Sequence, residues 1–119
     1  MTFDDVRAIA LQWPEVVDGS SYGTPALKVR GKLLARLKED GESVVIQGVE
    51  HDERALLIEM QPNIFYFTDH YRDWPIVLLR LPEASPEVIE AFLLRRWRAL
   101  ASKKALKSFE PIKSERSQK

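Results

Sequence analysis

Apolar residues recur at two different spacings along the chain, and each spacing is typical of a different element. Three segments carry apolar residues three or four positions apart, the spacing of one helix face, and they span residues 3–13, 51–60 and 86–102. The third has a strong start signal, because Ser85 supplies an N-cap and Pro86 a first-turn proline. We therefore predict three helices.

Each predicted helix has an apolar side that is expected to face a core. In the second helix, acidic residues fill the first turn and the apolar side consists of Leu56, Leu57 and Met60. Trp13 and Trp97 lie on the apolar stripes of the first and third helices. We expect all five side chains to be buried.

Between the first two helices the spacing changes to alternation, which is typical of strands with one buried face. Gly31 offers one turn, and the Asp-Gly pair within 39-EDGE-42 is a strong hairpin signal for a second. Folding the chain at these turns predicts the pairs Leu27–Ala35, Val29–Leu33, Leu37–Val44 and Ala35–Ile46. All of these residues then share one face, so the two hairpins support each other.

Two further strands are predicted over residues 64–68 and 76–81, joined by the polar connection 68-TDHYRDWP-75. Residues 18–25 are expected to form a loop because they are rich in Gly, Ser and Pro. The order is therefore helix, three strands, helix, two strands, helix. We predict a two-layer α+β domain over residues 1–107, in which helices cover one face of a five-stranded antiparallel sheet.

The composition limits the class of protein. A chain of 119 residues is long enough for one domain, and the absence of cysteine excludes disulfides, thiolate metal sites and thiol catalysis. No apolar run approaches the roughly 20 residues that a membrane span needs. The acidic start also lacks the apolar centre of a secretory signal. We therefore expect a cytoplasmic protein with no membrane partner.

Charge is distributed unevenly, although 18 basic and 18 acidic side chains cancel over the whole chain. Residues 95–119 hold nine bases and two acids, a net charge of +7, and the other 94 residues carry the opposite net charge. Such an end can bind a polyanion, or it can be a solubilising helix end with a basic tail. We expect residues 108–119 to form a disordered tail.

The predicted sheet places a second group of basic residues on the face opposite the core. Its members are Lys28, Arg30, Lys32, Arg36 and Lys38, with Leu34, Val45 and Gln47 among them. A solvated face is usual for an antiparallel sheet with a core on one side. The alternative is an electropositive surface for phosphates or acidic partners.

Residues with catalytic or metal-binding chemistry form no coherent set. His70 lies near Asp69 and Asp73, but a third strong ligand is missing, so no metal is expected. Ser20 or Ser21 could be combined with His70 and Asp69 as a triad on paper, and any chain of this length offers such a set. The sequence therefore favours a binding protein over an enzyme, and we expect no cofactor.

Aromatic and polar residues gather in two predicted loops that could flank a groove. They are Tyr22, Thr24, His70, Tyr71, Arg72 and Trp74. These residues suit stacking and backbone contacts with nucleic acid, or a groove for a peptide or small molecule. The alternative is that Tyr71 and Trp74 fold back over the edge of the core.

One pattern of residues resembles a known family. Gly23, Pro25, Ala26, Lys28, Gly31 and Lys32 form the pattern Gly-x-Pro-Ala-x-Lys-x-x-Gly-Lys. With 68-TDHYRDWPIVLLRL-81 and the helix that carries Trp97, residues 1–105 resemble the MmcQ/YjbR family of small bacterial proteins. The resemblance implies an α-β3-α-β2-α fold, shared with secretion chaperones and frataxin-like domains, which agrees with the predicted order.

The resemblance also implies a function. Members of the family are usually described as DNA-binding, because their fold is similar to a double-wing transcription-factor domain. On this interpretation the chain is a monomer that binds double-stranded DNA without enzymatic activity, and Lys28, Arg30, Lys32, Arg36 and Lys38 contact phosphates. The alternative is an adaptor that holds a protein or small ligand in the groove between residues 20–25 and 68–75.

Overall fold

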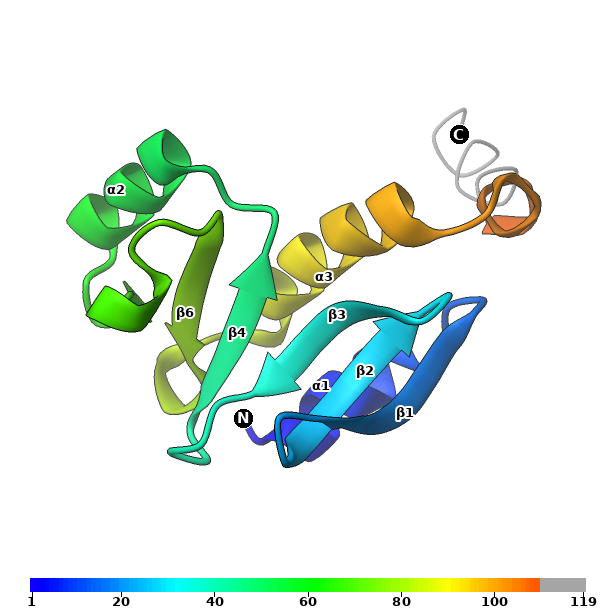
Figure 1. Cartoon of the computed structure of the whole chain (residues 1–119), viewed down its shortest axis with the longest axis horizontal. Coiled ribbons are helices and arrows are strands. Elements are labelled where there is room, and N and C mark those ends of the chain that lie inside the picture. The colour runs from blue at the N-terminus through cyan, green and yellow to red at the C-terminus, as the bar shows by residue number, and fades with distance from the viewer. Residues whose placement is uncertain (110–119) are drawn as a thin grey trace.

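The computed structural model describes residues 1–109 of the chain. Its helices are α1 (Phe3–Ala10), α2 (His51–Met60), α3 (Pro86–Leu100) and a helical segment over residues 103–109. Its strands are β1 (Val16–Ser21), β2 (Thr24–Val29), β3 (Lys32–Leu37), β4 (Ser43–Gln47), β5 (Phe65–Tyr66) and β6 (Ile76–Arg80). Two single-turn 3-10 helices, η1 (Asp69–Tyr71) and η2 (Leu81–Glu83), flank β6. The predicted α+β class is confirmed (Figure 1).

The sheet has six strands, one more than predicted, in the order β1-β2-β3-β4-β6-β5, and every neighbouring pair is antiparallel. The additional strand is β1, so the expectation of a loop over residues 18–25 is wrong. β1 lies at an edge and most of its side chains are exposed. Its sequence VVDGSS therefore lacks the alternation of apolar residues that marks a half-buried strand.

The first two turns of the sheet share one geometry. Tyr22–Gly23 joins β1 to β2 and Arg30–Gly31 joins β2 to β3, and all four residues have positive φ, as a type I′ hairpin turn requires. Because the second turn begins at Arg30, Val29 pairs with Lys32 and not with Leu33 as predicted.

A shift of register then restores the expected pairing further along. Lys28 pairs with Leu33, Leu27 pairs with Ala35, and Leu34 is the extra residue between them. Leu34 consequently joins the main core, whereas Leu33 turns to the opposite face, the reverse of the prediction for both. The predicted pairs Leu37–Val44 and Ala35–Ile46 are confirmed.

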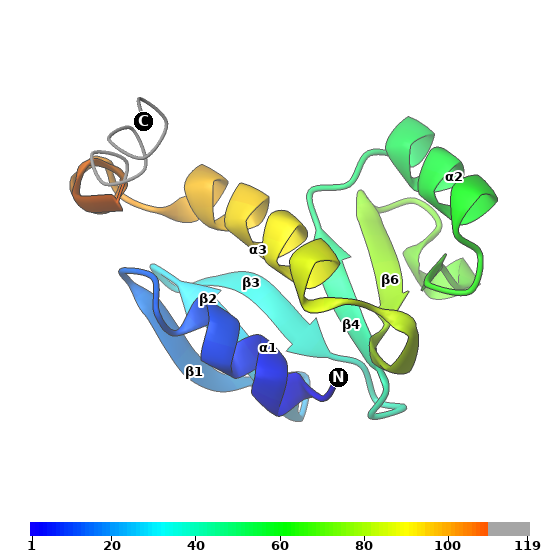
Figure 2. The same ribbon diagram turned by 180° about the vertical axis from the view of Figure 1, so that it is seen from behind.

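One face of the sheet is covered by α1 and α3, which lie side by side across it in Figure 2. Trp13 and Trp97 are buried there as predicted, with ring centroids 6.1 Å apart. The indole N–H of Trp97 donates to the carbonyl of Pro14 at 2.8 Å, which ties α3 to the chain after α1. Apolar side chains therefore close this face, and the buried indole N–H has its acceptor.

Helix α2 has the predicted limits, but the predicted buried side is wrong. It lies beside β5 and β6, away from the layer of α1 and α3 (Figure 1). Leu56 and Met60 are 54% and 70% exposed, whereas Leu57 packs against the core and Arg54 is buried. The helix docks through Arg54, a residue that an apolar pattern does not reveal.

The face opposite α1 and α3 is not uniformly solvated, in contrast to the expectation of one buried face. Val45, Ile76 and Leu78 form a second, smaller apolar cluster there with Tyr71, and Tyr66 packs against it. Tyr71 comes from the connection between β5 and β6 and covers strands β4 and β6. Part of this face, over β4 and β6, is therefore closed by a loop.

The chain continues past α3 into the helical segment over residues 103–109, and Phe109 lies with its ring 5.1 Å from that of Trp97. Two residues of the predicted tail, Ser108 and Phe109, belong to this segment. The rest of that prediction, residues 110–119, lies outside the described residues. Within residues 1–109, none of the helices has the length and apolar character that crossing a bilayer requires.

Candidate functional site

A pocket of about 710 Å³ lies between the β1–β2 turn and the connection from β5 to β6. This volume is in the range of pockets that hold small molecules. Its lining residues come from three loops and three strands: Tyr22, Leu33, Arg36, Glu39, Val45, Gln47, His70, Tyr71, Trp74, Pro75 and Ile76. The pocket lies on the sheet face opposite α1 and α3, and it shares Val45, Tyr71 and Ile76 with the smaller apolar cluster.

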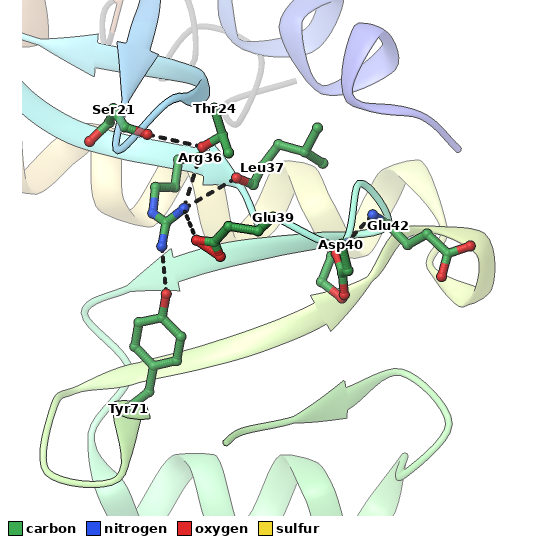
Figure 3. Close-up of polar contacts among 9 residues, drawn as sticks. Ser21, Thr24, Arg36, Leu37, Glu39, Asp40, Glu42 and Tyr71 are labelled. Atoms are coloured by element: carbon green, nitrogen blue, oxygen red, sulfur yellow. Dashed lines mark hydrogen bonds and ion pairs between the residues drawn. The ribbon is translucent and has the colours of Figure 1, made fainter. Parts of the chain in front are cut away.

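Arg36 of β3 makes the central polar contacts of the pocket, as Figure 3 shows. It is only 5% exposed. Its Nη2 donates to the hydroxyl of Tyr71 at 2.6 Å, and its Nη1 lies 3.1 Å from Glu39 Oε1 and 3.3 Å from Thr24 Oγ1. One guanidinium thus joins both loops that border the pocket to the central strands.

The β1–β2 turn forms one wall. Thr24 donates its hydroxyl to the carbonyl of Ser21 at 3.0 Å and accepts from Arg36, so it fixes the turn to the floor of the pocket. Tyr22 has φ of 53°, and its ring lies 5.2 Å from the guanidinium carbon of Arg36 while remaining 83% exposed. An aromatic side chain is thus held at the rim with most of its surface free.

The opposite wall is the segment over residues 67–75, and a buried arginine of α2 holds it in place. Arg54 Nη1 donates to the carbonyls of Tyr71 at 3.0 Å, Trp74 at 3.2 Å and Ile76 at 3.0 Å, and Nη2 donates to that of Arg72 at 2.9 Å. Its guanidinium also lies 3.9 Å from the ring centroid of Phe67. These contacts compensate a buried cation that has no carboxylate partner within residues 1–109.

Three other predicted groove residues lie on this wall. Trp74 lines the pocket and is 60% exposed. His70 also lines it, with its ring edge against Tyr71 at 4.7 Å between centroids. Arg72 pairs with Asp69 at the surface and is not part of the lining. The ion pair with Asp69 raises the pKa of Arg72 above its ordinary value.

Glu39 is the acidic group of the pocket. Its own backbone N–H, followed by the hydrogen bond from Arg36, holds the pKa of Glu39 below the ordinary range of a glutamate. Its side chain is 59% exposed, so this ion pair lies at the rim. Glu39 therefore partly neutralises Arg36 without filling the pocket.

The basic residues predicted to contact DNA do not share one surface. Arg36 is buried in the pocket, and Arg30 donates to the carbonyl of Leu100 at 3.5 Å, which places it at the end of α3. Lys28 lies in β2 beside Val17 of β1 and Leu33 of β3, Lys32 is the first residue of β3 after the turn, and Lys38 follows the end of β3. The turn at Gly31 and the extra residue Leu34 break the simple alternation on which the prediction of one face depended.

Other candidates from the sequence are not brought together. Within residues 1–109, no cluster of three or more potential ligands could hold a metal ion. No hydrogen bond in this part of the chain joins His70 to Asp69 or to Ser21; Ser21 instead accepts from Thr24 through its carbonyl. The residues that sequence reasoning missed include Arg54, Leu33 and Glu39. Arg54 contacts a distant segment and Leu33 changes face with the register shift, whereas Glu39 pairs with Arg36 three residues before it.

Comparison with known proteins places the fold. The family model described as YjbR matches residues 11–99. A crystal structure of Deinococcus radiodurans protein DR2400, whose family domain is DUF419, is similar with a TM-score of 0.66 and 16% identity, covering 90% of this chain and 86% of the other. No curated protein gives a significant match. At this identity the structural likeness supports the fold alone.

Proposed function

The chain belongs to the YjbR family, and we propose that its domain is a binding module that takes a small molecule or short peptide segment into the pocket between residues 20–25 and 68–75. The observation that carries this proposal is that two exposed aromatic side chains lie at the rim of the pocket. Tyr22 and Trp74 lie on opposite loops of one pocket, and each exposes more than half of its surface. Large aromatic side chains left exposed beside a pocket are typical of ligand or partner recognition.

The hydrogen bonds that hold the two pocket walls in place also support this proposal. Both walls are tied to the same floor residue, one through Thr24 and the other through Tyr71. The second wall is further fixed by four hydrogen bonds from Arg54. A site formed before the ligand arrives loses little conformational entropy on binding.

A neutral aromatic probe tests the proposal. We expect 2-naphthylacetamide, added to the ¹⁵N-labelled protein, to shift amide resonances of residues 22–24, 70–74 and 47. Tyr22→Ala with Trp74→Ala should weaken binding by about tenfold, since each exposed ring contributes apolar contact area. The matched control is Leu56→Ala with Met60→Ala, which removes exposed apolar side chains from α2. Equal effects of the two double variants, or shifts spread over α2, would contradict the proposal.

DNA binding is a second candidate, and one contact favours it at a different place from that predicted. The hydrogen bond from Arg30 to Leu100 brings the β2–β3 turn beside the end of α3. Exposed Lys32 lies just after this turn, and exposed Lys103, Lys104 and Lys107 follow α3. A cationic end of this kind suits the phosphate backbone.

Duplex DNA titrated by fluorescence anisotropy at two salt concentrations tests this candidate. Binding should weaken by about 0.9 log units per log unit of salt for each phosphate contact, and Lys103→Glu with Lys104→Glu should weaken it more than Arg72→Glu on the far loop. No binding below about 100 μM DNA at low salt would exclude it, since non-specific binding is normally tighter than this.

A further inference from the structure

The chemistry of the pocket floor indicates what kind of ligand fits there. A guanidinium has five N–H groups, and in Arg36 the contacts to protein use those of Nη1 and one of Nη2. Within residues 1–109, the Nε–H and the second Nη2–H have no acceptor. Two charge-assisted donors therefore remain on a side chain that lines the pocket.

The Nε atom of Arg36 is not completely buried, and Arg36 lines the pocket. No fully buried side-chain nitrogen or oxygen in the described residues lacks a hydrogen-bond partner. Since Nε has no such partner, the small exposed fraction of Arg36, 6% of its side chain, must include this atom. An acceptor that enters the pocket can reach it.

The charges that line the pocket favour an anionic acceptor. Among the lining residues the only acid is Glu39, at the rim, and the groups that can be cationic are Arg36 and His70. A guanidinium presents donors in a planar fork that matches a carboxylate, which has two oxygens and needs two donors. The apolar remainder of the lining, with Tyr22 and Trp74 at the rims, suits a ring.

We propose that the pocket binds a small aromatic carboxylate, with the carboxylate on the free donors of Arg36 and the ring between Tyr22 and Trp74. This inference rests on the proposed function of the pocket and adds the class of ligand. Glu39 is bonded to Nη1 and leaves the free donors open, but its exposed carboxylate adds a negative charge at the rim that disfavours a second carboxylate. The pocket volume of about 710 Å³ is why we assign a small molecule and not a folded partner.

A matched pair of probes tests the ligand class. We expect 2-naphthylacetate to bind about tenfold more tightly than 2-naphthylacetamide by calorimetry, because hydrogen bonds to charged groups are the stronger kind. Equal affinity for the two probes would overturn the carboxylate assignment and leave the binding module intact. No binding of either probe, with no shift of pocket resonances, would overturn both.

Variants at the rim separate the role of Arg36 in ligand binding from its role in folding. Arg36→Gln removes the proposed donors, but it also removes a buried side chain that holds both loops. Its effect on binding is therefore interpreted together with that of Glu39→Gln. Glu39→Gln removes this negative charge from an exposed position, and we expect it to tighten binding of 2-naphthylacetate by roughly threefold without changing that of the amide. The control is Glu42→Gln, which removes the same charge from an exposed residue of the same turn.

A last experiment distinguishes the carboxylate of a free small molecule from that of a protein C-terminus. The tripeptide Gly-Gly-Trp carries the same chemistry at the end of a chain. Binding of this tripeptide tenfold more tightly than 2-naphthylacetate would overturn the small-molecule assignment in favour of a protein C-terminus. Weaker or equal binding supports a free small molecule. A Glu39→Gln variant that leaves naphthylacetate affinity unchanged would contradict the contact with Arg36.

Discussion

The two faces of the sheet are closed by different kinds of interaction. Under α1 and α3, side chains such as Trp97 and Leu93 fill the space, and a single hydrogen bond satisfies the buried indole N–H. On the opposite face, Arg36 and Arg54 hold two loops by hydrogen bonds, and a pocket remains between the loops. Close apolar packing leaves no cavity, whereas hydrogen bonds to two loops can hold them apart with a pocket between them.

This difference explains why the pocket can have a fixed shape without being filled. A purely apolar loop would be stabilised by closing on the sheet, since every buried methylene contributes about 0.8 kcal/mol. The 67–75 segment is instead held at its carbonyls by Arg54, and only Tyr71 enters the small apolar cluster. Trp74 therefore stays exposed at the rim.

The largest expected effect compares a tryptophan from each face. Trp97→Ala should reduce the free energy of unfolding by about 3–5 kcal/mol, because it leaves a large cavity in the main core. Trp74→Ala should change it by less than about 0.5 kcal/mol, since most of this side chain is exposed. Chemical denaturation measures both. Similar losses for the two variants would show that the pocket face is packed like the core.

The next effect concerns the anchor of the loop. Arg54→Met should cost about 2–4 kcal/mol, because it leaves four carbonyls without their charged donor. Hydrogen exchange at the amides of Tyr71 and Trp74 should accelerate while that in α3 follows only global unfolding. Arg72→Met, at an exposed ion pair, is the control and should be nearly neutral. Unchanged exchange in the loop would argue against anchoring by Arg54.

A smaller effect is expected at the contact between loop and floor. Tyr71→Phe removes the hydroxyl that accepts from Arg36 Nη2, and should reduce the free energy of unfolding by about 1–2 kcal/mol. Tyr22→Phe removes a hydroxyl from an exposed ring and should have no measurable effect. If the two substitutions are equivalent, the hydrogen bond between Tyr71 and Arg36 contributes nothing to stability.

The smallest effect is a dependence of the free energy of unfolding on pH, which involves Glu15 beside the end of α3 and Glu39 at the pocket. Hydrogen bonds from the backbone N–H and then the hydroxyl of Ser102 lower the pKa of Glu15, and its own backbone N–H and then Arg36 lower the pKa of Glu39. A lowered pKa in the folded state means that the stabilisation is complete above the unfolded value, about 4.3. It is lost as the pH falls through the folded pKa.

Carboxyl carbon NMR measures this directly. Both glutamates should titrate below the ordinary value of a glutamate, and the midpoint for Glu15 should return toward that value in Ser102→Ala. The midpoint for Glu39 should be unaffected by that substitution, because the two carboxylates belong to different parts of the molecule. An ordinary pKa for Glu15 in the unmodified protein would contradict the contact with Ser102.

Much of the fold follows from local sequence signals, and the errors have identifiable causes. The hairpin at Asp40–Gly41 and the N-cap at Ser85 were predictable because both act within a few residues. The strand β1 was missed because pairing with β2, and not burial, defines it. The buried side of α2 was missed because a charged residue, Arg54, docks it.

The site was predictable only in outline. The two loops that border the pocket are rich in aromatic and polar residues, so their sequences alone suggest a groove. The burial of Arg36 could not be inferred from an alternating pattern in which it resembles any exposed basic residue. Its partners Thr24 and Tyr71 lie 12 and 35 residues away in the chain, and only the folded sheet brings them together.

The three tryptophans allow the central claim to be tested in one measurement. Trp74 lies at the pocket rim, whereas Trp13 and Trp97 lie in the core under α1 and α3. In a ¹H–¹⁵N NMR titration with 2-naphthylacetate, the indole resonance of Trp74 should move saturably while those of Trp13 and Trp97 stay in place. A saturable shift of Trp97 without one of Trp74, or no shift at all, would contradict a working pocket on this face.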